Sequence, residues 1–119
     1  MTEGIIIPIP VHPLRLRERG YNQADIIAKC IARIIRRPIY PGALMRTKNT
    51  QPQVVGAKRE IRLKNMSDAF TVPNTMRPSI AGVYVLLIDD VVTTGATIRS
   101  AGKELLRAGA RGVWVISIA

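Results

Sequence analysis

The sequence has few of the residues that mark a disulfide framework, a metal cluster or an aromatic surface. Its 119 residues include one Cys, one His, one Trp, one Phe and three Tyr. Cys30 cannot form a disulfide within the chain and has no metal-ligand spacing around it, which indicates a reducing intracellular compartment. A chain of 119 residues can bury the core of one domain without covalent cross-links.

Long hydrophobic runs are also missing. The apolar stretch at residues 5–7 is interrupted at once by Pro8 and Pro10, so it is typical of neither a signal peptide nor a membrane helix. We therefore expect a cytoplasmic protein with no membrane span.

Acidic residues are scarce, because 8 Asp and Glu face 18 Lys and Arg, which gives a formal net charge of +10. Such an excess attracts phosphorylated ligands and nucleic acid. Part of it is typical of a solvated surface, since cations near helix C-termini suit the helix dipole. The residues interpreted in this way are Arg33, Arg36, Arg37, Arg107 and Arg111.

The segment from Val85 to Thr97 carries the chemistry. An apolar run at residues 85–88 is typical of a strand buried on both faces, and therefore of a parallel sheet. Asp89 and Asp90 follow it directly. Because ligands of such sheets bind beyond the carboxyl ends of the strands, we expect both carboxylates at the floor of a crevice.

The turn after the carboxylates has the composition of a phosphate site at a helix N-terminus. Its predicted phosphate-binding residues are Val92, Thr93, Thr94, Gly95, Ala96 and Thr97. Carboxylates about 4 Å apart repel by about 1 kcal/mol in water, so hydroxyl donors or a cation should compensate them. A 5-phosphorylated ribose fits both halves. A merely capped strand-to-helix junction would need fewer such residues, and a phosphorelay receiver would need a later Asp, which the sequence lacks.

Apolar periodicity places the other elements. We expect strands at 5–9, near 39–45, at 69–72 and at 113–118, with a turn-rich link at 73–82. A helix should follow the N-cap Asn22, and another should span 97–108 and end at Gly109. The first helix has one apolar face made of Ile26, Ile27, Cys30, Ile31, Ile34 and Ile35; the second should turn Ile98, Ala101, Leu105 and Ala108 inward.

The pattern of apolar residues, two acids, two variable positions and Thr-Thr-Gly-x-Thr resembles the phosphoribosyl-pyrophosphate (PRPP) loop of type I phosphoribosyltransferases. The resemblance implies an α/β, three-layer fold: a central, mainly parallel sheet flanked by helices, plus a flexible basic lid. It further implies a single domain over 1–119, a PRPP loop at 85–97, a lid at about 46–65, and catalytic roles for Asp89 and Asp90.

Two further segments resemble the ComF-type branch of that family, named after competence proteins of bacterial DNA uptake. They contain Pro8, Pro10, His12, Pro13, Arg15, Arg17, Arg19 and the run Gly20, Tyr21, Asn22, Gln23, and then Arg46, Thr50, Gln53, Asn65, Ala69 and Phe70. The resemblance implies a pyrophosphate loop with Pro10, His12, Arg15 and Arg19, and a lid with Arg46, Thr50, Gln53 and Lys58. Residues 54–57 depart from the family pattern, and the cysteine-rich zinc-binding region with which relatives often begin is absent.

The implied activity is magnesium-dependent transfer of 5-phosphoribosyl from PRPP to an unidentified acceptor, with magnesium carried by PRPP near Asp89 and Asp90. Thr93 stands where purine-salvage relatives place an Asp base, and His12 is interpreted as structural. Two alternatives stay open: a non-catalytic PRPP or nucleotide sensor, and a DNA-uptake accessory that contacts single-stranded DNA or a competence helicase. The fold also commonly forms homodimers.

Overall fold

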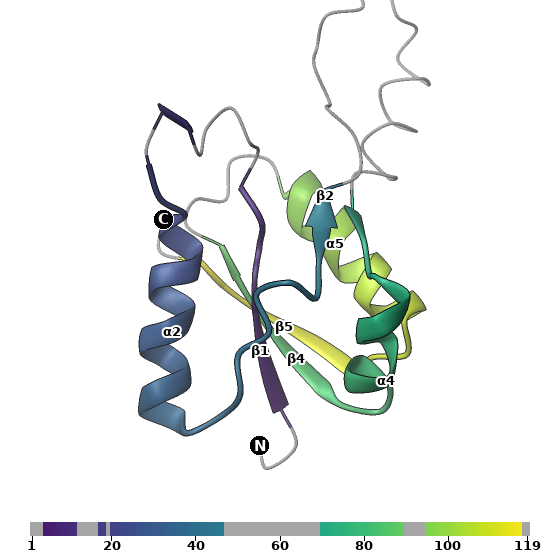
Figure 1. Cartoon of the computed structure of the whole chain (residues 1–119). Helices are drawn as coiled ribbons and strands as arrows, with labels where there is room; N and C mark the ends of the chain where they lie inside the picture. Colours follow the sequence, from purple (N-terminus) through teal and green to yellow (C-terminus); the bar gives the residue numbers. More distant parts are fainter. Residues whose placement is uncertain (1–3, 12–16, 19, 47–69, 90–94, 118–119) are drawn as a thin grey trace, which may run out of the picture.

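The computed structural model describes residues 4–11, 17–18, 20–46, 70–89 and 95–117 (Figure 1). Its elements are β1 (Gly4–Pro8), α2 (Gln23–Ile35), β2 (Met45–Arg46), β3 (Phe70–Thr71), η1 (Asn74–Met76), α4 (Arg77–Ile80), β4 (Tyr84–Asp89), α5 (Ala96–Arg107) and β5 (Gly112–Ser117). Among these described elements, no helix is both long and apolar enough to cross a membrane.

The main sheet is parallel, with β4 between β1 and β5. Gly4, Tyr84 and Gly112 form the first row of the three strands, at their amino ends. At the other end, Asp89 lies opposite Ser117. A separate antiparallel pair joins β2 to β3.

Helices cover both faces of the main sheet, as predicted. α2 packs against β1 and β4 on one face, and α5 packs on the other face together with β3 (Figure 1). The alternation of side chains along the strands divides the core accordingly. Ile5, Ile7 and Leu87 face α5, whereas Ile6 and Leu86 face α2. The predicted α/β fold with a helix-flanked parallel sheet is confirmed, and most of the expected lid lies outside the described residues.

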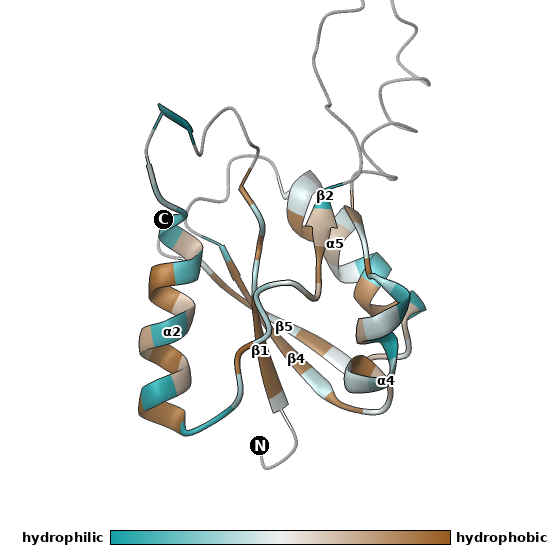
Figure 2. Cartoon of the chain, in the orientation of Figure 1, coloured by the Kyte–Doolittle hydropathy of each residue, from teal (hydrophilic) through white to brown (hydrophobic). Residues whose placement is uncertain are grey.

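The buried face of α2 differs from the predicted one. Ala24, Ala28 and Ala32 are buried against the sheet, whereas Ile34 is 79% exposed. Ile26, Cys30 and Ile35, predicted on the same inward face, are exposed as well, and only Ile27 and Ile31 pack against the core. Small alanines let the helix approach the strands closely, so the isoleucines lie along its sides and its outer surface, where Figure 2 shows hydrophobic bands.

Two other expectations need correction. The stretch at 73–82 is partly helical, because Pro78 stands at the start of α4, where a missing backbone N–H breaks no helical hydrogen bond. The strand expected near 39–45 is reduced to one bridge between Ile39 and Ile6 and to the two-residue strand β2, which includes Arg46.

Candidate functional site

β4 brings Asp89 to the carboxyl edge of the sheet. The strand is buried from Val85 onward, and Asp89, its last residue, is 7% exposed. Among the described residues, Asp89 and Ser100 are the polar side chains that the fold buries. Burying a carboxylate costs free energy unless the site offers it partners, and for that reason such groups are frequent at functional sites.

Gly95 marks the point where the chain enters α5. Its φ of +74° is a left-handed conformation that side-chain-bearing residues rarely adopt, and an added Cβ would meet no atom within 4 Å. The N–H of Arg99 donates the first helical hydrogen bond to the Gly95 carbonyl, at 3.0 Å. In an α-helix the N–H groups before that bond, here those of Ala96 and Thr97, have no partner within the helix, and such groups are typical anion-binding positions.

Predicted site residues between Asp89 and Gly95 lie outside the described part of the chain. These residues are Asp90, Val92, Thr93 and Thr94. Their assignment stays a prediction. The structure does establish that the segment containing them joins the carboxyl end of the central strand to the N-terminus of a 12-residue helix.

The chain that leaves β1 is fixed beside β4. The N–H of Ile9 donates to the Ile88 carbonyl at 2.8 Å, which extends the ladder one residue beyond the strand. The next carbonyl, that of Pro10, accepts a hydrogen bond from Arg46 Nε at 2.7 Å. Of the predicted pyrophosphate loop, only Pro10 is described; His12, Arg15 and Arg19 are not. That loop therefore begins directly beside the strand that carries Asp89.

Arg46 connects the antiparallel pair to this loop. Besides its bond to Pro10, its guanidinium group lies over the Phe70 ring, 4.9 Å from the centroid. Arg46 and Phe70 are also paired in register between β2 and β3. The lid role predicted for Arg46 stays a prediction, and in the structure the residue lies in β2, at the start of the predicted lid. Thr50, Gln53 and Lys58 lie outside the described residues.

Asn22 is confirmed as the N-cap of α2. Its Oδ1 accepts from the Ala24 N–H at 3.0 Å, while its Nδ2 donates to the Ile9 carbonyl at 3.2 Å. The second contact was not predicted. It ties the start of α2 to the end of β1, so Asn22 and Arg46 hold the consecutive carbonyls of Ile9 and Pro10, where the predicted pyrophosphate loop begins.

The donor types suit a magnesium ion that arrives with a phosphorylated ligand. No group of three or more His, Cys, Asp or Glu side chains comes together among the described residues. Magnesium needs no such group, because it usually keeps several waters and binds through one or two carboxylates plus substrate phosphates. The carboxylate of Asp89 fits that requirement, and Asp90 adds a second carboxylate in the sequence.

This arrangement of strand, carboxylate, turn and helix belongs to a known class of protein. Residues 22–119 match the phosphoribosyl transferase domain family, so the chain belongs to that family. Its fold agrees with a solved structure of glutamine PRPP amidotransferase from B. subtilis in complex with ADP and GMP. That match has a TM-score of 0.61 and 19% identity, and it covers 97% of this chain and 22% of the other.

Within the family, the sequence is similar to proteins named for competence and DNA utilization, which confirms the ComF-type resemblance. It is 32% identical over 114 residues to Competence protein F of Haemophilus influenzae and 33% identical over 105 residues to Competence protein ComFC of Bacillus subtilis. It is 32% identical over 110 residues to DNA utilization protein YhgH of Escherichia coli K12.

The matches cover 96%, 88% and 92% of this chain, in the same order, but only 49%, 39% and 46% of the relatives. The chain thus spans about half the length of the curated relatives that it matches.

Proposed function

We propose that the chain binds PRPP and transfers its 5-phosphoribosyl group, in a magnesium-dependent reaction, to an acceptor with release of pyrophosphate. The observation that carries the proposal is the placement of Asp89. This buried carboxylate ends the central strand, and the chain that follows enters a helix N-terminus through the left-handed residue Gly95. Membership of the phosphoribosyl transferase domain family supports the same ligand.

Each half of the ligand has a counterpart in the chain. The carboxylates of Asp89 and Asp90 would accept hydrogen bonds from the 2′- and 3′-hydroxyls of the ribose. The N–H groups at the start of α5, with the positive end of the helix dipole, would hold the 5′-phosphate. Thr97 adds a hydroxyl in the first turn.

The reaction replaces one bond at C1 of the ribose. The bond from C1 to the pyrophosphate oxygen breaks, its electron pair leaves with pyrophosphate, and a bond from the acceptor to C1 forms. Negative charge therefore grows on the leaving group, which preplaced cations stabilise. By resemblance, Arg15 and Arg19 would supply these cations, since one guanidinium group can bind two phosphate oxygens at once. Bound magnesium would neutralise further charge on the phosphates.

Two alternatives differ from this proposal in chemistry. The same crevice could serve a sensor that binds PRPP or a nucleotide without reacting, because no base for the acceptor is identified in the turn. A role as an accessory in DNA uptake is supported by the names of the competence and DNA utilization relatives and by the charge of +10.

Calorimetric titration with PRPP, with and without magnesium, tests the binding. We expect the wild type to bind and the double variant Asp89→Asn/Asp90→Asn to show no binding, because neutral amides accept more weakly from ribose hydroxyls. Glu104→Gln is the matched control, since it removes one carboxylate from the last turn of α5, at the far end of that helix. Unchanged affinity of the double variant would contradict the proposed ribose contacts.

Pyrophosphate release separates the transferase from the sensor. Wild-type protein with PRPP and magnesium should release pyrophosphate when the correct acceptor is added from a panel of amines, purines and pyrimidines. The double variant at Asp89 and Asp90 should release none. Binding of PRPP without release for any member of the panel would favour the sensor.

A further inference from the structure

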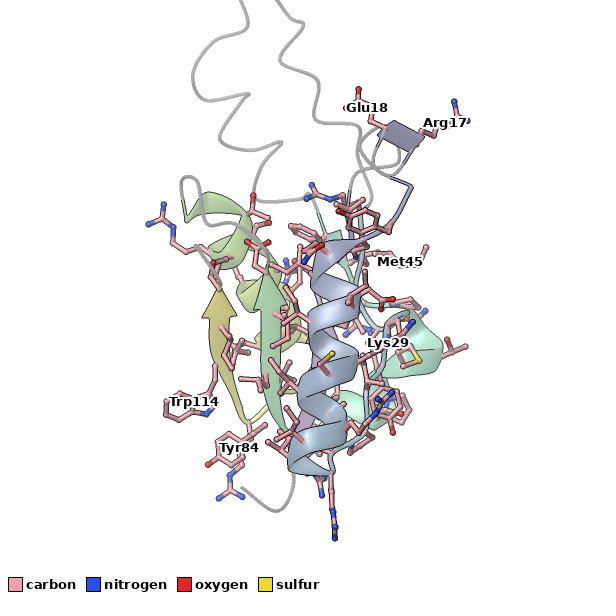
Figure 3. The ribbon with its side chains drawn as sticks, turned by 90° about the vertical axis from the view of Figure 1, so that its left-hand side faces the viewer. Arg17, Glu18, Lys29, Met45, Tyr84 and Trp114 are labelled. Carbon is pink, nitrogen blue, oxygen red and sulfur yellow. The ribbon has the colours of Figure 1, made fainter. Side chains whose placement is uncertain are left out.

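Two of the few aromatic residues lie together at the amino ends of β4 and β5. Trp114 is paired in register with Leu86, and Tyr84 stands two residues before Leu86 on the same strand. Since Leu86 packs on the α2 side of the sheet, Tyr84 and Trp114 belong to that face as well. Figure 3 shows both rings at the same end of the sheet.

Among the described residues, no helix packs over this part of the sheet face. α2 packs against β1 and β4, whereas β5 is the edge strand and has α5 on its other face. Trp114 is accordingly 62% exposed and Ile116 38% exposed. An exposed Trp of this kind typically marks a contact surface, because its ring offers a large apolar face.

A guanidinium group completes the cluster. Arg111 lies over the Tyr84 ring, 5.5 Å from its centroid. That ring extends over Gly112, where an added Cβ would meet Tyr84 Cδ1 and Cε1 at 3.0 Å. Arg111, Tyr84 and Trp114 therefore lie at the same corner of the sheet, and we call these three residues the aromatic platform.

Positive charge extends from the platform along the amino edge of the sheet. Arg37 donates through Nε to the Gly4 carbonyl at 2.7 Å, and Gly4 is paired with Tyr84. The exposed Arg36 precedes it at the end of α2.

The acidic side chains that the structure describes lie elsewhere. Glu104 is on α5, on the opposite face of the sheet, where it accepts from Arg107 at 3.0 Å. Asp25 is in the first turn of α2, at the other end of that helix, and Asp89 is at the carboxyl edge. Glu18 lies far from Tyr84 and Trp114 in Figure 3.

We propose that the aromatic platform binds single-stranded nucleic acid, with a base stacked on Trp114 and the neighbouring phosphates held by Arg111 and Arg37. Bases stack on aromatic rings whatever their sequence, and a basic border follows the backbone. A second copy of the chain is the less suitable occupant, because two copies that each carry +10 repel each other.

The platform is separate from the proposed PRPP crevice. Tyr84 and Asp89 are the two ends of β4, and a six-residue strand spans about 17 Å. The inference therefore does not depend on the proposed transferase, and either one can fail without the other.

The intrinsic tryptophan fluorescence of the protein reports on Trp114 alone, since the chain contains one Trp. Adding an oligothymidylate to the wild-type protein should quench Trp fluorescence as a base stacks on the ring. The affinity is measured separately by anisotropy of a dye-labelled oligothymidylate, and a duplex of the same length should bind more weakly than the single strand. An oligothymidylate that binds without quenching would overturn the platform as its site.

Substitutions then separate stacking from charge. Trp114→Ala should weaken oligothymidylate binding about ten-fold, and Trp114→Phe should restore most of it. Arg111→Ala should weaken binding more than Lys103→Ala, which removes one charge from the opposite face. Equal losses for these two variants, or full affinity of Trp114→Ala, would overturn the proposal.

A folding defect and self-association each need a control. The far-ultraviolet circular dichroism spectrum of Trp114→Ala should match that of the wild type, which excludes a folding defect. Calorimetry with PRPP should give the two proteins the same affinity, and a loss of PRPP binding by Trp114→Ala but not by Trp114→Phe would overturn the separation of the sites. Sedimentation should show a monomer at the concentrations used. A wild-type dimer that Trp114→Ala dissociates would overturn the proposal in favour of a second copy on this face.

Discussion

Arg46 is held on two sides by groups that are distant in the sequence. Its Nε donates to the Pro10 carbonyl, 36 positions away, and its guanidinium plane lies over Phe70. A charged hydrogen bond contributes about 1.5 to 3 kcal/mol and a cation–π contact about 0.5 to 1 kcal/mol. One side chain thus joins β2, β3 and the loop after β1.

Replacing Arg46 should measure this connection. We expect Arg46→Ala to lower the free energy of unfolding by about 2 kcal/mol, and Arg46→Lys to recover only part of the loss, because an ammonium group cannot reproduce the planar geometry. Urea unfolding at constant pH is the measurement. Arg99→Ala, at an exposed position of α5, is the control; an equal loss in the two alanine variants would contradict the role of Arg46.

Local features of the structure, such as a helix cap, could be predicted from a residue and its neighbours in the sequence. Asn22 could be identified as a cap because a short polar side chain precedes a periodic apolar segment. Its second bond, to the Ile9 carbonyl, depends on how closely α2 approaches β1, and no spacing in the sequence encodes that distance. The hydrogen bond between Arg46 and the Pro10 carbonyl could not be predicted, for the same reason.

The elements around the site could be predicted closely. The expected helix at 97–108 is observed as Ala96–Arg107, and the expected strand at 113–118 as Gly112–Ser117. Strong periodicity and a clear cap made these assignments possible. The prediction of the inward face of α2 was wrong. Hydrophobicity alone favours isoleucine at buried positions, whereas the close packing of this helix on the sheet places alanine there.

Two glycines join the helices on the α5 side to the strands that follow. The Gly82 N–H donates to the Gly109 carbonyl at 2.8 Å, which links the turn after α4 to the turn after α5. Both have positive φ, +77° for Gly82 and +104° for Gly109. Only Gly109 is crowded, since its Cβ would lie 3.3 Å from Ala81 Cα.

The two positions should therefore respond differently to alanine. Gly82→Ala should cost about 1 kcal/mol of folding free energy, from the left-handed conformation alone. Gly109→Ala should cost more than twice as much, because its φ is less accessible to L-residues and the new methyl group meets backbone. Thermal unfolding followed by circular dichroism would measure both, and equal shifts of the midpoint would contradict the crowding at Gly109.

At the scale of the whole molecule, the excess of positive charge opposes the compact state. A net charge of +10 in a 13.1 kDa protein repels itself on folding, and salt screens that repulsion. We expect the melting temperature to rise as sodium chloride increases from about 10 mM to about 150 mM. Lys103→Glu should raise the melting temperature at low salt and reduce its dependence on salt; a melting temperature that falls with added salt would contradict the argument.

The overall architecture followed from one well-marked segment. An apolar strand that ends in carboxylates and leads through a glycine turn into a helix requires a parallel neighbour, and therefore helices on both faces. The uncovered face of β5 could not be predicted, because Trp114 in an apolar strand suggests burial, and its exposure depends on how far α2 extends across the sheet.

The hydrogen bond from Ile9 to the Ile88 carbonyl has a consequence for how a ligand could enter or leave. This bond lies one residue past the end of β1, and it joins the segment that leaves β1 to the last part of β4. The two segments therefore stay one strand spacing apart, about 4.8 Å. Separating these two segments would break backbone hydrogen bonds of the main sheet. The ends of β1 and β4 therefore form a rigid base, and a ligand held at this edge of the sheet would meet two strands that do not separate.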